Sequence, residues 1–292
     1  MDITNFGKGG VPQKRKIRDY RFELVAGAAV EEEFEGDKVI FNIKNQGKSL
    51  SCVGQAVSAY AEVLNFLETG EKIKLSARDV YSLVYLPSGG AYIADAIKKW
   101  RNSGIVTEED ATSYENGIEP SETFMHKRDD ITPEEQEEGM SYMAGKYTTW
   151  DDKNFDIYRQ AIRTGKGVVA LAYGNNVCWQ NAVLQVPDVI EQCDWCHAIY
   201  FCSSIIYMKD GKECLKFLNS WDGWGDGGFG YMPREYFEKG FLRCPTTVLD
   251  IPNGTYVSLM SQIKNLQEMI SLTKIIIELK RKIAEFLKKV GK

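Results

Sequence analysis

The sequence predicts an α+β protein of two lobes, one helical and one built on antiparallel strands, followed by a C-terminal amphipathic helix. Apolar residues recur at helical spacing in the first half of the chain, whereas short β-branched and aromatic runs separated by turn signals fill the second half. Helices followed by strands are typical of α+β folds. A Pro-Asn-Gly break at 252–254 then precedes a basic, amphipathic run. We therefore expect one domain over residues 1–251 and a separate helix over residues 252–292.

The composition is that of an ordinary globular protein. The chain has 292 residues, 43% hydrophobic and 26% charged, which is enough for a large core. A net charge of −5 argues against nucleic acid as a partner. Residues 258–292 carry 8 Lys and Arg against 3 Glu, so this segment contributes +5 and leaves −10 for the rest. Because no signal-peptide pattern and no run of membrane-spanning length is present, we expect a cytoplasmic protein by default.

The first half reads as a lead-in followed by helices. The expected elements are an extended segment over 1–45 with a short strand at 38–43, a long helix from Cys52, a helix from Ser76-Ala77 to the break at 87–90, a helix over 92–100, and surface loops over 106–150. Ser51 is expected to cap the long helix. We interpret His126, within the loops, as an ordinary surface histidine.

The second half reads as strands after one helix. The expected elements are a helix over 155–164, a buried strand over 168–174, a strand over 197–208 and a returning strand over 213–221. Asp210-Gly211 is a hairpin signal between the last two strands. This order would leave the Cys52 helix at the boundary between the two lobes.

Cys52 is the first candidate for chemistry. As the first residue of a helix it would lie among unpaired amide donors, where the helix dipole favours a thiolate. Gln46, six residues earlier, would lie on the preceding loop and could direct its amide to the same place. The local motif alone is equally compatible with a reactive thiol and with a buried structural cysteine.

A thiol nucleophile needs a histidine base and a third group that orients the histidine. The chain has two histidines, and His197 begins a strand 145 residues after Cys52. Asn219 ends the next strand, 22 residues after His197. If the two strands pair across Asp210-Gly211, their outer ends lie side by side and His197 and Asn219 become neighbours.

These residues together resemble the papain-like cysteine peptidases (family C1), in a divergent, microbial-type branch. The resemblance rests on NQG with a cysteine six residues after the glutamine, on His-Ala at the start of a strand, and on NSWDGWGDGGFGY. Supporting motifs are RDYRF at 18–22, SGGAYIADA at 88–96 and GVVALAYG at 167–174. The similar region runs from about Val11 to Asp250 and implies a papain-like two-lobed fold.

The resemblance implies a catalytic role for four residues. Cys52 would be the nucleophile, His197 the general base and then acid, and Asn219 the group that orients the imidazole. Gln46 and the Cys52 N–H would form the oxyanion hole. The implied activity is that of a cysteine endopeptidase, a thiol protease that forms a thioester acyl-enzyme on a peptide or protein substrate and needs no cofactor. A catalytically silent papain-like module that binds peptides or supports assembly is the alternative.

Five further residues are implied to bind substrate or shield the site. Trp221 matches the tryptophan that shields the Asn–His hydrogen bond from water. Gly89 and Gly90 match the glycines where a substrate strand pairs with the cleft. Ala91 and Tyr92 would border the pocket for the second residue before the scissile bond.

The sequence also departs from the family pattern. Ser49 replaces the cysteine of a disulfide beside the active site, Val53 replaces an aromatic residue, and Cys196 replaces the residue before the base. We therefore expect packing alone to hold Gln46 and Cys52 in register. We recognise no long inhibitory propeptide before the similar region, which fits either a branch without one or a mature chain.

The other cysteines leave several interpretations open. Cys193 to His197 fits the C-x-x-C-H signature of haem attachment, but this reading leaves Cys52 and Asn219 unexplained. A zinc site with other cysteines, a local disulfide and free thiols are the alternatives. We predict no metal site.

The C-terminal segment carries a heptad seam of apolar residues, namely Met269, Leu272, Ile276, Leu279, Ile283, Phe286 and Val290. Such a helix has to bury its apolar face. We expect self-association through residues 255–292 as a coiled coil or bundle. Packing against the rest of the chain and binding to an anionic membrane surface are the alternatives.

Overall fold

The structure is a computed structural model that describes residues 2–13, 32–150 and 153–249, together with Thr273, Ile276, Leu279, Lys280 and Lys282. The chain divides into two units, Met1–Asp250 and Ile251–Lys292. In the second unit the five described residues are helical and exposed. The other residues of the predicted coiled coil, and the RDYRF motif, lie outside the described residues.

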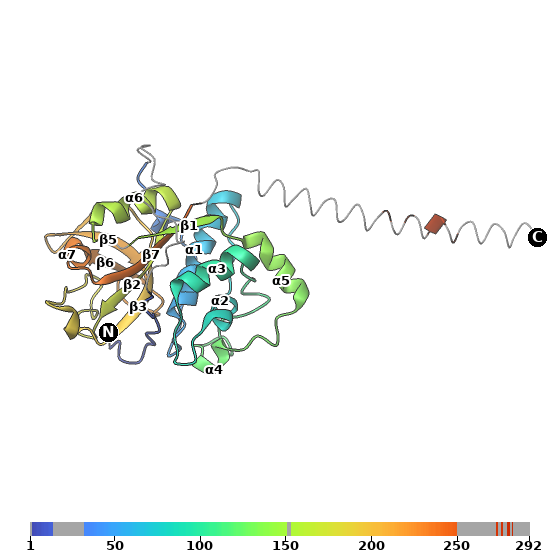
Figure 1. Ribbon diagram of the computed structural model, residues 1–292, viewed down its shortest axis with the longest axis horizontal. Helices are drawn as coiled ribbons and strands as arrows, with labels where there is room; N and C mark the ends of the chain where they lie inside the picture. Colours follow the sequence, from blue (N-terminus) through green and yellow to red (C-terminus); the bar gives the residue numbers. More distant parts are fainter. Residues whose placement is uncertain are drawn as a thin grey trace, which may run out of the picture. The chain divides into compact units, whose positions relative to one another are not determined.

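The helices of the first unit are concentrated before residue 143 (Figure 1). They are α1 Cys52–Thr69, α2 Ala77–Val84, α3 Ile93–Ser103, α4 Glu122–Met125, α5 Pro133–Gly139, α6 Phe155–Gly165 and α7 Arg234–Glu238, with short 3-10 turns at Gly36–Lys38, Met140–Tyr142 and Ile190–Gln192. Helix α1 is buried along its first 13 residues, because small and apolar side chains occupy almost every position there. It ends at Gly70, whose left-handed conformation suits a glycine.

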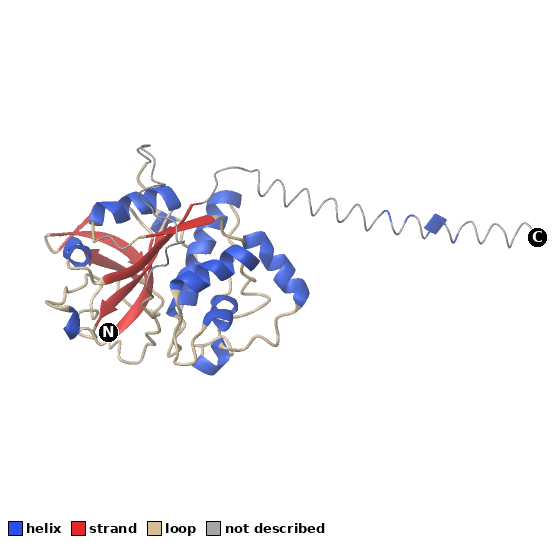
Figure 2. Ribbon diagram, in the orientation of Figure 1, coloured by secondary structure: helices blue, strands red, loops and turns tan. Residues whose placement is uncertain are grey.

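The strands, drawn in red in Figure 2, form one antiparallel sheet. Their order is β1-β7-β2-β3-β5-β4, with β6 paired to β5. Their bounds are β1 Lys146–Thr149, β2 Val168–Gly174, β3 Trp195–Phe201, β4 Tyr207–Lys209, β5 Lys212–Leu218, β6 Phe229–Pro233 and β7 Leu242–Leu249. Strands β2 and β3 are buried over nearly their whole length, as their continuous apolar sequences predict.

Two hydrophobic cores underlie the two lobes. One is centred on α1, α2 and α3, and the other on α6, α7 and the sheet. Strand β3 contributes to both, since Ala198 and Tyr200 belong to the first core and Ile199 and Phe201 to the second. The period of two along a strand therefore places β3 between the lobes, against α1. The α+β fold is confirmed.

Several expected elements are confirmed. Helices begin at Cys52 and Ala77, and Ser76 accepts a hydrogen bond from the Asp79 N–H as an N-cap. Ser51 occupies the N-cap position of α1, but its side chain does not cap the helix. Its hydroxyl instead contacts Ser49 and Gln55.

Other expectations are wrong. Residues 39–43 form no strand, since a 3-10 turn at Gly36–Lys38 leads into irregular backbone. The stretch 106–150 contains α4, α5 and β1 as well as loops. Its α5 begins with a full capping box between Thr132 and Glu135, a local signal that outweighs the polar composition. The expected strand at 197–208 is broken between β3 and β4.

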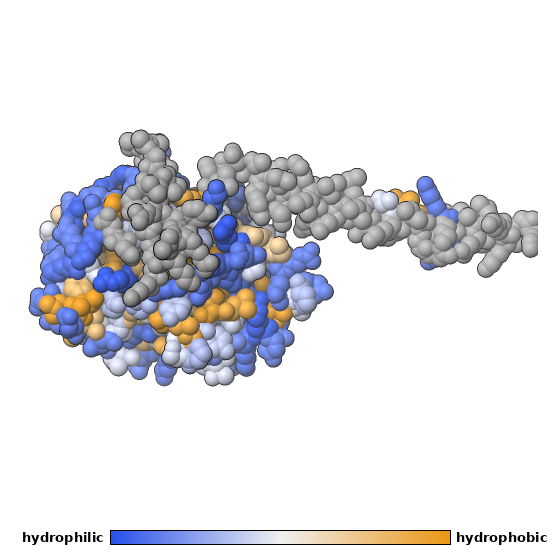
Figure 3. Space-filling model, in the orientation of Figure 1, coloured by the Kyte–Doolittle hydropathy of each residue, from blue (hydrophilic) through white to orange (hydrophobic). Residues whose placement is uncertain are grey.

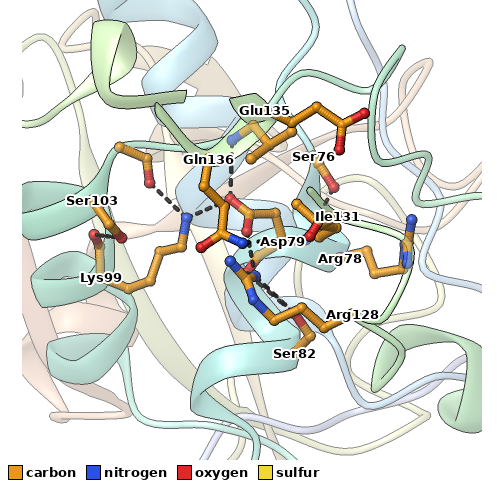
Figure 4. Close-up of polar contacts among 12 residues, drawn as sticks. Ser76, Arg78, Asp79, Ser82, Lys99, Ser103, Arg128, Ile131, Glu135 and Gln136 are labelled. Carbon is orange, nitrogen blue, oxygen red and sulfur yellow. Dashed lines mark hydrogen bonds and ion pairs between the residues drawn. The ribbon is translucent and has the colours of Figure 1, made fainter. Parts of the chain in front are cut away.

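A buried charge network braces the helical lobe (Figure 4). Asp79 of α2 is fully buried and accepts hydrogen bonds from Lys99 of α3, from Arg128 at 2.5 Å and from the Val106 N–H at 2.9 Å. One carboxylate therefore joins two helices and two loop segments. Burial alone would raise the pKa of Asp79, but these donors hold it below its ordinary value.

The surface of the first unit is mostly polar, with apolar side chains in small groups on the face in Figure 3. Among the described residues, no helix is both long enough and apolar enough to cross a membrane.

Candidate active site

Cys52 lies at the amino end of α1, where the lobes meet. Its side chain is fully buried, and Sγ accepts a hydrogen bond from the backbone N–H of Ala198 at 3.4 Å. Ala198 follows His197 on β3, so the first candidate nucleophile and the first candidate base are adjacent. The helix start and the neighbouring strand together bring this thiol and this histidine to one place.

His197 and Asn219 form the expected pair. The imidazole Nε2 lies 2.8 Å from Asn219 Oδ1, and both residues are buried. Oδ1 also accepts the Ser220 N–H at 2.8 Å, which fixes the orientation of the amide. Nε2 is therefore the protonated nitrogen, and Nδ1 has no hydrogen-bond partner among the described residues.

The pairing of strands differs in detail from the expectation. The hairpin at Asp210-Gly211 joins β4 to β5, with Tyr207 opposite Cys214. Strand β3 pairs with β5 only at Tyr200–Leu218 and Phe201–Phe217. His197 and Asn219 still meet, because Asn219 directly follows the β5 end of that short ladder.

Trp221 covers the imidazole. Its ring centroid lies 4.5 Å from that of His197, and the side chain is fully buried. Trp179, which the sequence analysis did not single out, meets His197 edge-on at 5.9 Å. Two indoles thus exclude water from the His197–Asn219 hydrogen bond, which strengthens it.

Gln46 is fixed against Ser220. Its backbone N–H donates to Ser220 O at 2.9 Å, and its Oε1 accepts the Ser220 hydroxyl at 2.5 Å. Ser49 donates to Gln46 O at 2.7 Å and pairs with Ser51 at 2.7 Å. The expectation that packing alone holds Gln46 and Cys52 in register is therefore wrong. Hydrogen bonds among buried serines link them in place of a disulfide.

The N-terminal strap, residues 3–11, lies across these side chains. Its backbone contacts are Gly7 N to Gly47 O (2.9 Å), Gln46 Nε2 to Gly7 O (2.9 Å), Ala91 N to Gly9 O (2.9 Å), Gly10 N to Cys196 O (3.1 Å) and Val11 N to Ala91 O (3.2 Å). The Gln46 amide, the candidate oxyanion donor, is thus already bonded to a strap carbonyl.

Glycines let the strap lie this close. A Cβ on Gly7 would stand 1.8 Å from Ser49 O, and a Cβ on Gly9 would stand 1.9 Å from Leu50 O. Both obstacles are backbone atoms, so they cannot move aside easily. The sequence predicts only an extended lead-in for this segment. The signal for the close approach is the pattern G-K-G-G at 7–10.

Burial under the strap determines the charge of the two reactive groups. Burial raises the pKa of the Cys52 thiol to about 11, although nearby backbone N–H groups favour the thiolate. Burial lowers the pKa of His197 to about 3. The hydrogen bond to Asn219 opposes this shift, and the ammonium of Lys8 on the strap adds to it by a smaller amount. With the strap in place, a neutral thiol faces a neutral imidazole near pH 7.

The predicted substrate edge, Gly89 to Tyr92, lies beside the strap. At this edge the strap hydrogen-bonds to the backbone of Ala91. Gly90 bonds elsewhere, because its N–H donates to the Tyr81 hydroxyl at 3.0 Å and its carbonyl accepts from Leu86 N at 2.8 Å. Tyr81 also donates to Glu122 at 2.6 Å, and Glu122 accepts the Leu50 N–H at 2.6 Å. Glu122, which sequence reasoning missed, therefore ties this edge to the Cys52 loop.

All seven cysteines are free thiols in the structure. Cys193 and Cys196 of the C-x-x-C-H sequence lead into and lie on β3, rather than on a helix. Among the described residues, no group of three or more His, Cys, Asp and Glu side chains is arranged to hold a metal ion.

The chain is similar to a known protein family and to solved structures. A model of the papain family cysteine proteases matches residues 31–245. No curated protein sequence matches the chain. The fold is similar to that of xylellain, a cysteine protease from Xylella fastidiosa, with a TM-score of 0.70 and 19% identity over 85% of this chain and 97% of that one.

Two proenzyme structures show the same fold. One is procathepsin B S9 from Trypanosoma congolense, with a TM-score of 0.62 and 13% identity over 85% of this chain and 87% of that chain. The other is digestive procathepsin L 3 from the larval midgut of Tenebrio molitor, with a TM-score of 0.61 and 16% identity over 84% of this chain and 76% of that chain.

Proposed function

Because this chain belongs to the papain family of cysteine proteases, we propose that it is an endopeptidase that acts through Cys52, His197 and Asn219 and that the N-terminal strap keeps latent. The observation that carries the proposal is the bond from His197 Nε2 to Asn219 Oδ1, together with the bond from the N–H of Ala198, the next residue, to Cys52 Sγ. Nδ1 has no hydrogen-bond partner among the described residues. This order of groups is what a thiol nucleophile needs from its base.

The chemistry follows from these positions. Once the strap leaves, His197 Nδ1 takes the Cys52 proton, and the resulting thiolate attacks the carbonyl carbon of a peptide bond. The imidazolium then returns its proton to the leaving amine, and a thioester remains on Sγ. Water, deprotonated by His197, hydrolyses the thioester and restores the thiol. Asn219 keeps the ring oriented throughout.

Oxyanion stabilisation falls to Gln46 and the Cys52 N–H. The Gly7 carbonyl already accepts from Gln46 Nε2 at 2.9 Å, which supports the view that this amide points at an acceptor in the cleft. A substrate carbonyl would take over that donor after the strap leaves. Removal of one preorganised donor of this kind typically lowers kcat by a factor of about 10²–10³.

The test is labelling of the full-length chain with an epoxide probe for thiol proteases, with the site mapped by mass spectrometry. Gly9→Val places a side chain against Leu50 O and should release the strap. We expect rapid labelling at Cys52 in this variant, slow labelling in the wild type, and none in Gly9→Val/Cys52→Ala. Thr4→Val, an isosteric change at an exposed position in the same strap, should behave as the wild type.

The second candidate is a silent peptide-binding module. It is favoured by the occupied cleft, since the strap lies over both reactive groups and leaves them neutral. The same experiment separates the two candidates. A folded Gly9→Val variant that the probe does not label would exclude the peptidase and leave the binding module.

A further inference from the structure

Two buried amide atoms near the candidate triad have no hydrogen-bond partner among the described residues. They are Asn219 Nδ2 and Gln55 Oε1, and both residues are almost fully buried. Oδ1 of Asn219 already accepts from His197 and from the Ser220 N–H, so its Nδ2 is a donor. Because a buried polar atom without a partner costs free energy, each of the two atoms needs a group to bond.

The serines before α1 fix which atom of the Gln55 amide is left over. Ser49 Oγ donates to the Gln46 carbonyl at 2.7 Å, because a carbonyl can only accept. A hydroxyl has a single proton, so in the Ser49–Ser51 pair at 2.7 Å Ser51 is the donor and Ser49 the acceptor. Ser51 Oγ then has only lone pairs to offer, and it accepts from Gln55 Nε2 at 3.2 Å. Oε1 is therefore the atom of Gln55 that lacks a partner, and it is an acceptor.

Gln55 and Asn219 line one small cavity. The cavity lies between α1, β3 and the residues at the end of β5, and every residue that lines it is buried. Its volume is about 10 Å³, which is close to the smallest volume that holds one water molecule. Lys44 also lines the cavity, but its ammonium already donates to Glu62 at 2.8 Å and to the Leu75 carbonyl at 2.9 Å.

This donor and this acceptor together select the ligand. A water molecule accepts from a donor on one side and donates to an acceptor on the other, whereas a metal cation needs acceptors on every side. A cation is also disfavoured by the buried ammonium of Lys44. We propose that the cavity binds one water molecule between Asn219 Nδ2 and Gln55 Oε1, and that Gln55 is thereby a positioning residue for Asn219. The inference deepens the proposed function and rests on it, because it takes Asn219 as the group that orients His197.

The bound water completes a continuous chain of hydrogen bonds across the site. The members of the chain are, in order, Asn219, the water, Gln55, Ser51, Ser49 and the Gln46 carbonyl. It joins the group that orients the imidazole to the loop that carries the candidate oxyanion donor. A bond at Nδ2, besides the two at Oδ1, limits rotation of the Asn219 amide and so helps to hold the imidazole in place.

A high-resolution crystal structure of the full-length wild type tests the water directly and needs no activity. We expect one ordered water within about 2.7–3.2 Å of both Asn219 Nδ2 and Gln55 Oε1. A cavity without water, or either atom bonded to a different group, would overturn the proposal. The crystal structure decides the matter even for a chain that cleaves no peptide, a result that would count against the proposed function alone.

Kinetics of the full-length Gly9→Val chain on one internally quenched peptide test the positioning role. We expect Gln55→Leu in this background to lower kcat about tenfold with little change in KM, because Gln55 acts on the triad and not on bound substrate. In combination with Asn219→Ala the same change should cost almost nothing further, since the amide that Gln55 positions is gone. Ser58→Ala is the matched control, because it removes a buried hydroxyl of α1 that does not line the cavity, and it should leave kcat unchanged.

A loss from Gln55→Leu that is equal with and without Asn219, or that appears only in KM, would show a merely structural role and contradict the proposal. An unchanged kcat would contradict it as well. Circular dichroism shows whether each variant is folded, and if Gln55→Leu does not fold, the wild-type crystal structure decides.

Discussion

Cys52 and His197 are both fully buried beneath the strap, and this burial decides their protonation. With pKa values of about 11 and about 3, the docked pair is neutral over a wide range of pH. An undocked pair has water on one side and can form the thiolate and imidazolium that catalysis needs. At the scale of residues, latency is therefore a matter of charge as well as of blocked access.

The sign of the pH effect follows from these shifts. In the docked state the pKa of His197 is about 3, below its ordinary value of 6.5. If release of the strap returns the imidazole to that ordinary value, His197 favours docking fully above pH 6.5 and opposes it increasingly as the pH falls. Cys52 acts in the opposite sense, because its raised pKa favours docking below 9.0 and opposes it as the pH rises toward 11. Between about pH 6.5 and pH 3 each unit weakens docking by up to about 1.4 kcal/mol.

We therefore predict that acid releases the strap. The rate of epoxide labelling at Cys52 in the wild type should rise between about pH 7 and pH 5, because His197 can take up a proton only in the undocked state. An ordinary thiol would show the reverse, since its thiolate fraction falls tenfold per unit. Gly9→Val, already undocked, serves as the control and should lack the rise. A wild-type rate that falls with pH like an ordinary thiol would contradict this account.

At this scale the sequence predicts much of the site. Turn and periodicity signals indicate one helix start and two strand ends. These positions allow the sequence to predict that four residues lie near one another, namely Gln46, Cys52, His197 and Asn219. The strap, Ser220 and Glu122 were not foreseen. Their contacts join residues far apart in the chain, such as Leu50 and Glu122 or Gln46 and Ser220, and no local pattern encodes such pairs.

Among the elements, α2 and α3 carry the candidate substrate edge, since that edge is the turn between them. Their mutual position depends on Asp79, which bonds Lys99 on α3 and Arg128 beyond α4. A buried carboxylate between two cations fixes geometry more than it adds stability, because desolvation offsets much of the attraction. Removing it leaves the two cations without their shared anion.

Asp79→Asn should therefore destabilise the protein strongly. We expect a loss of about 3–5 kcal/mol in the free energy of unfolding, because the variant leaves the buried Lys99 uncompensated. Chemical denaturation followed by circular dichroism measures it. Asp95→Asn, which breaks the partly exposed pair with Lys98 on α3, is the matched control and should cost less than about 1 kcal/mol. Equal losses in the two variants would show that Asp79 does not brace the lobe.

The helices and strands themselves were predicted with uneven success. Long periodic runs such as α1 and β2 are specified by their own sequences. The expected strand at 38–43 is wrong, although the segment is β-branched and aromatic. In the fold Ile40 packs at the edge of the helical core, and Asn42 and Lys44 hydrogen-bond to the buried Glu62. Tertiary contacts here override the local preference for a strand.

On the scale of the whole molecule, the strap links the two lobes. It contacts Gly47 and Ala91 on the helical side and Cys196 and Trp221 on the strand side. Ile3, at its beginning, is almost fully buried in the core of the strand lobe. Because these anchors lie on both sides of Cys52, release requires the loss of contacts to both lobes, and a single substitution at Gly9 acts on the part nearest the thiol.

The C-terminal segment bears on how whole chains assemble. From its heptad pattern we propose that residues 255–292 make the protein self-associate. Light scattering should give a multiple of the 33.1 kDa chain mass for the full-length protein and a single mass for a chain ending at residue 254. A full-length protein that is monomeric at micromolar concentration would favour packing of the segment against the chain itself.

The central claim is that this chain is a cysteine peptidase whose strap holds it latent. Hydrolysis of an internally quenched peptide pool at about pH 6, a value between the two limbs expected for the thiolate–imidazolium pair, tests it most directly. The account predicts rapid hydrolysis by Gly9→Val, slow hydrolysis by the wild type and by Thr4→Val, and none by Gly9→Val/Cys52→Ala or Gly9→Val/His197→Ala. Equal rates for wild type and Gly9→Val, or hydrolysis that persists without Cys52, would contradict it.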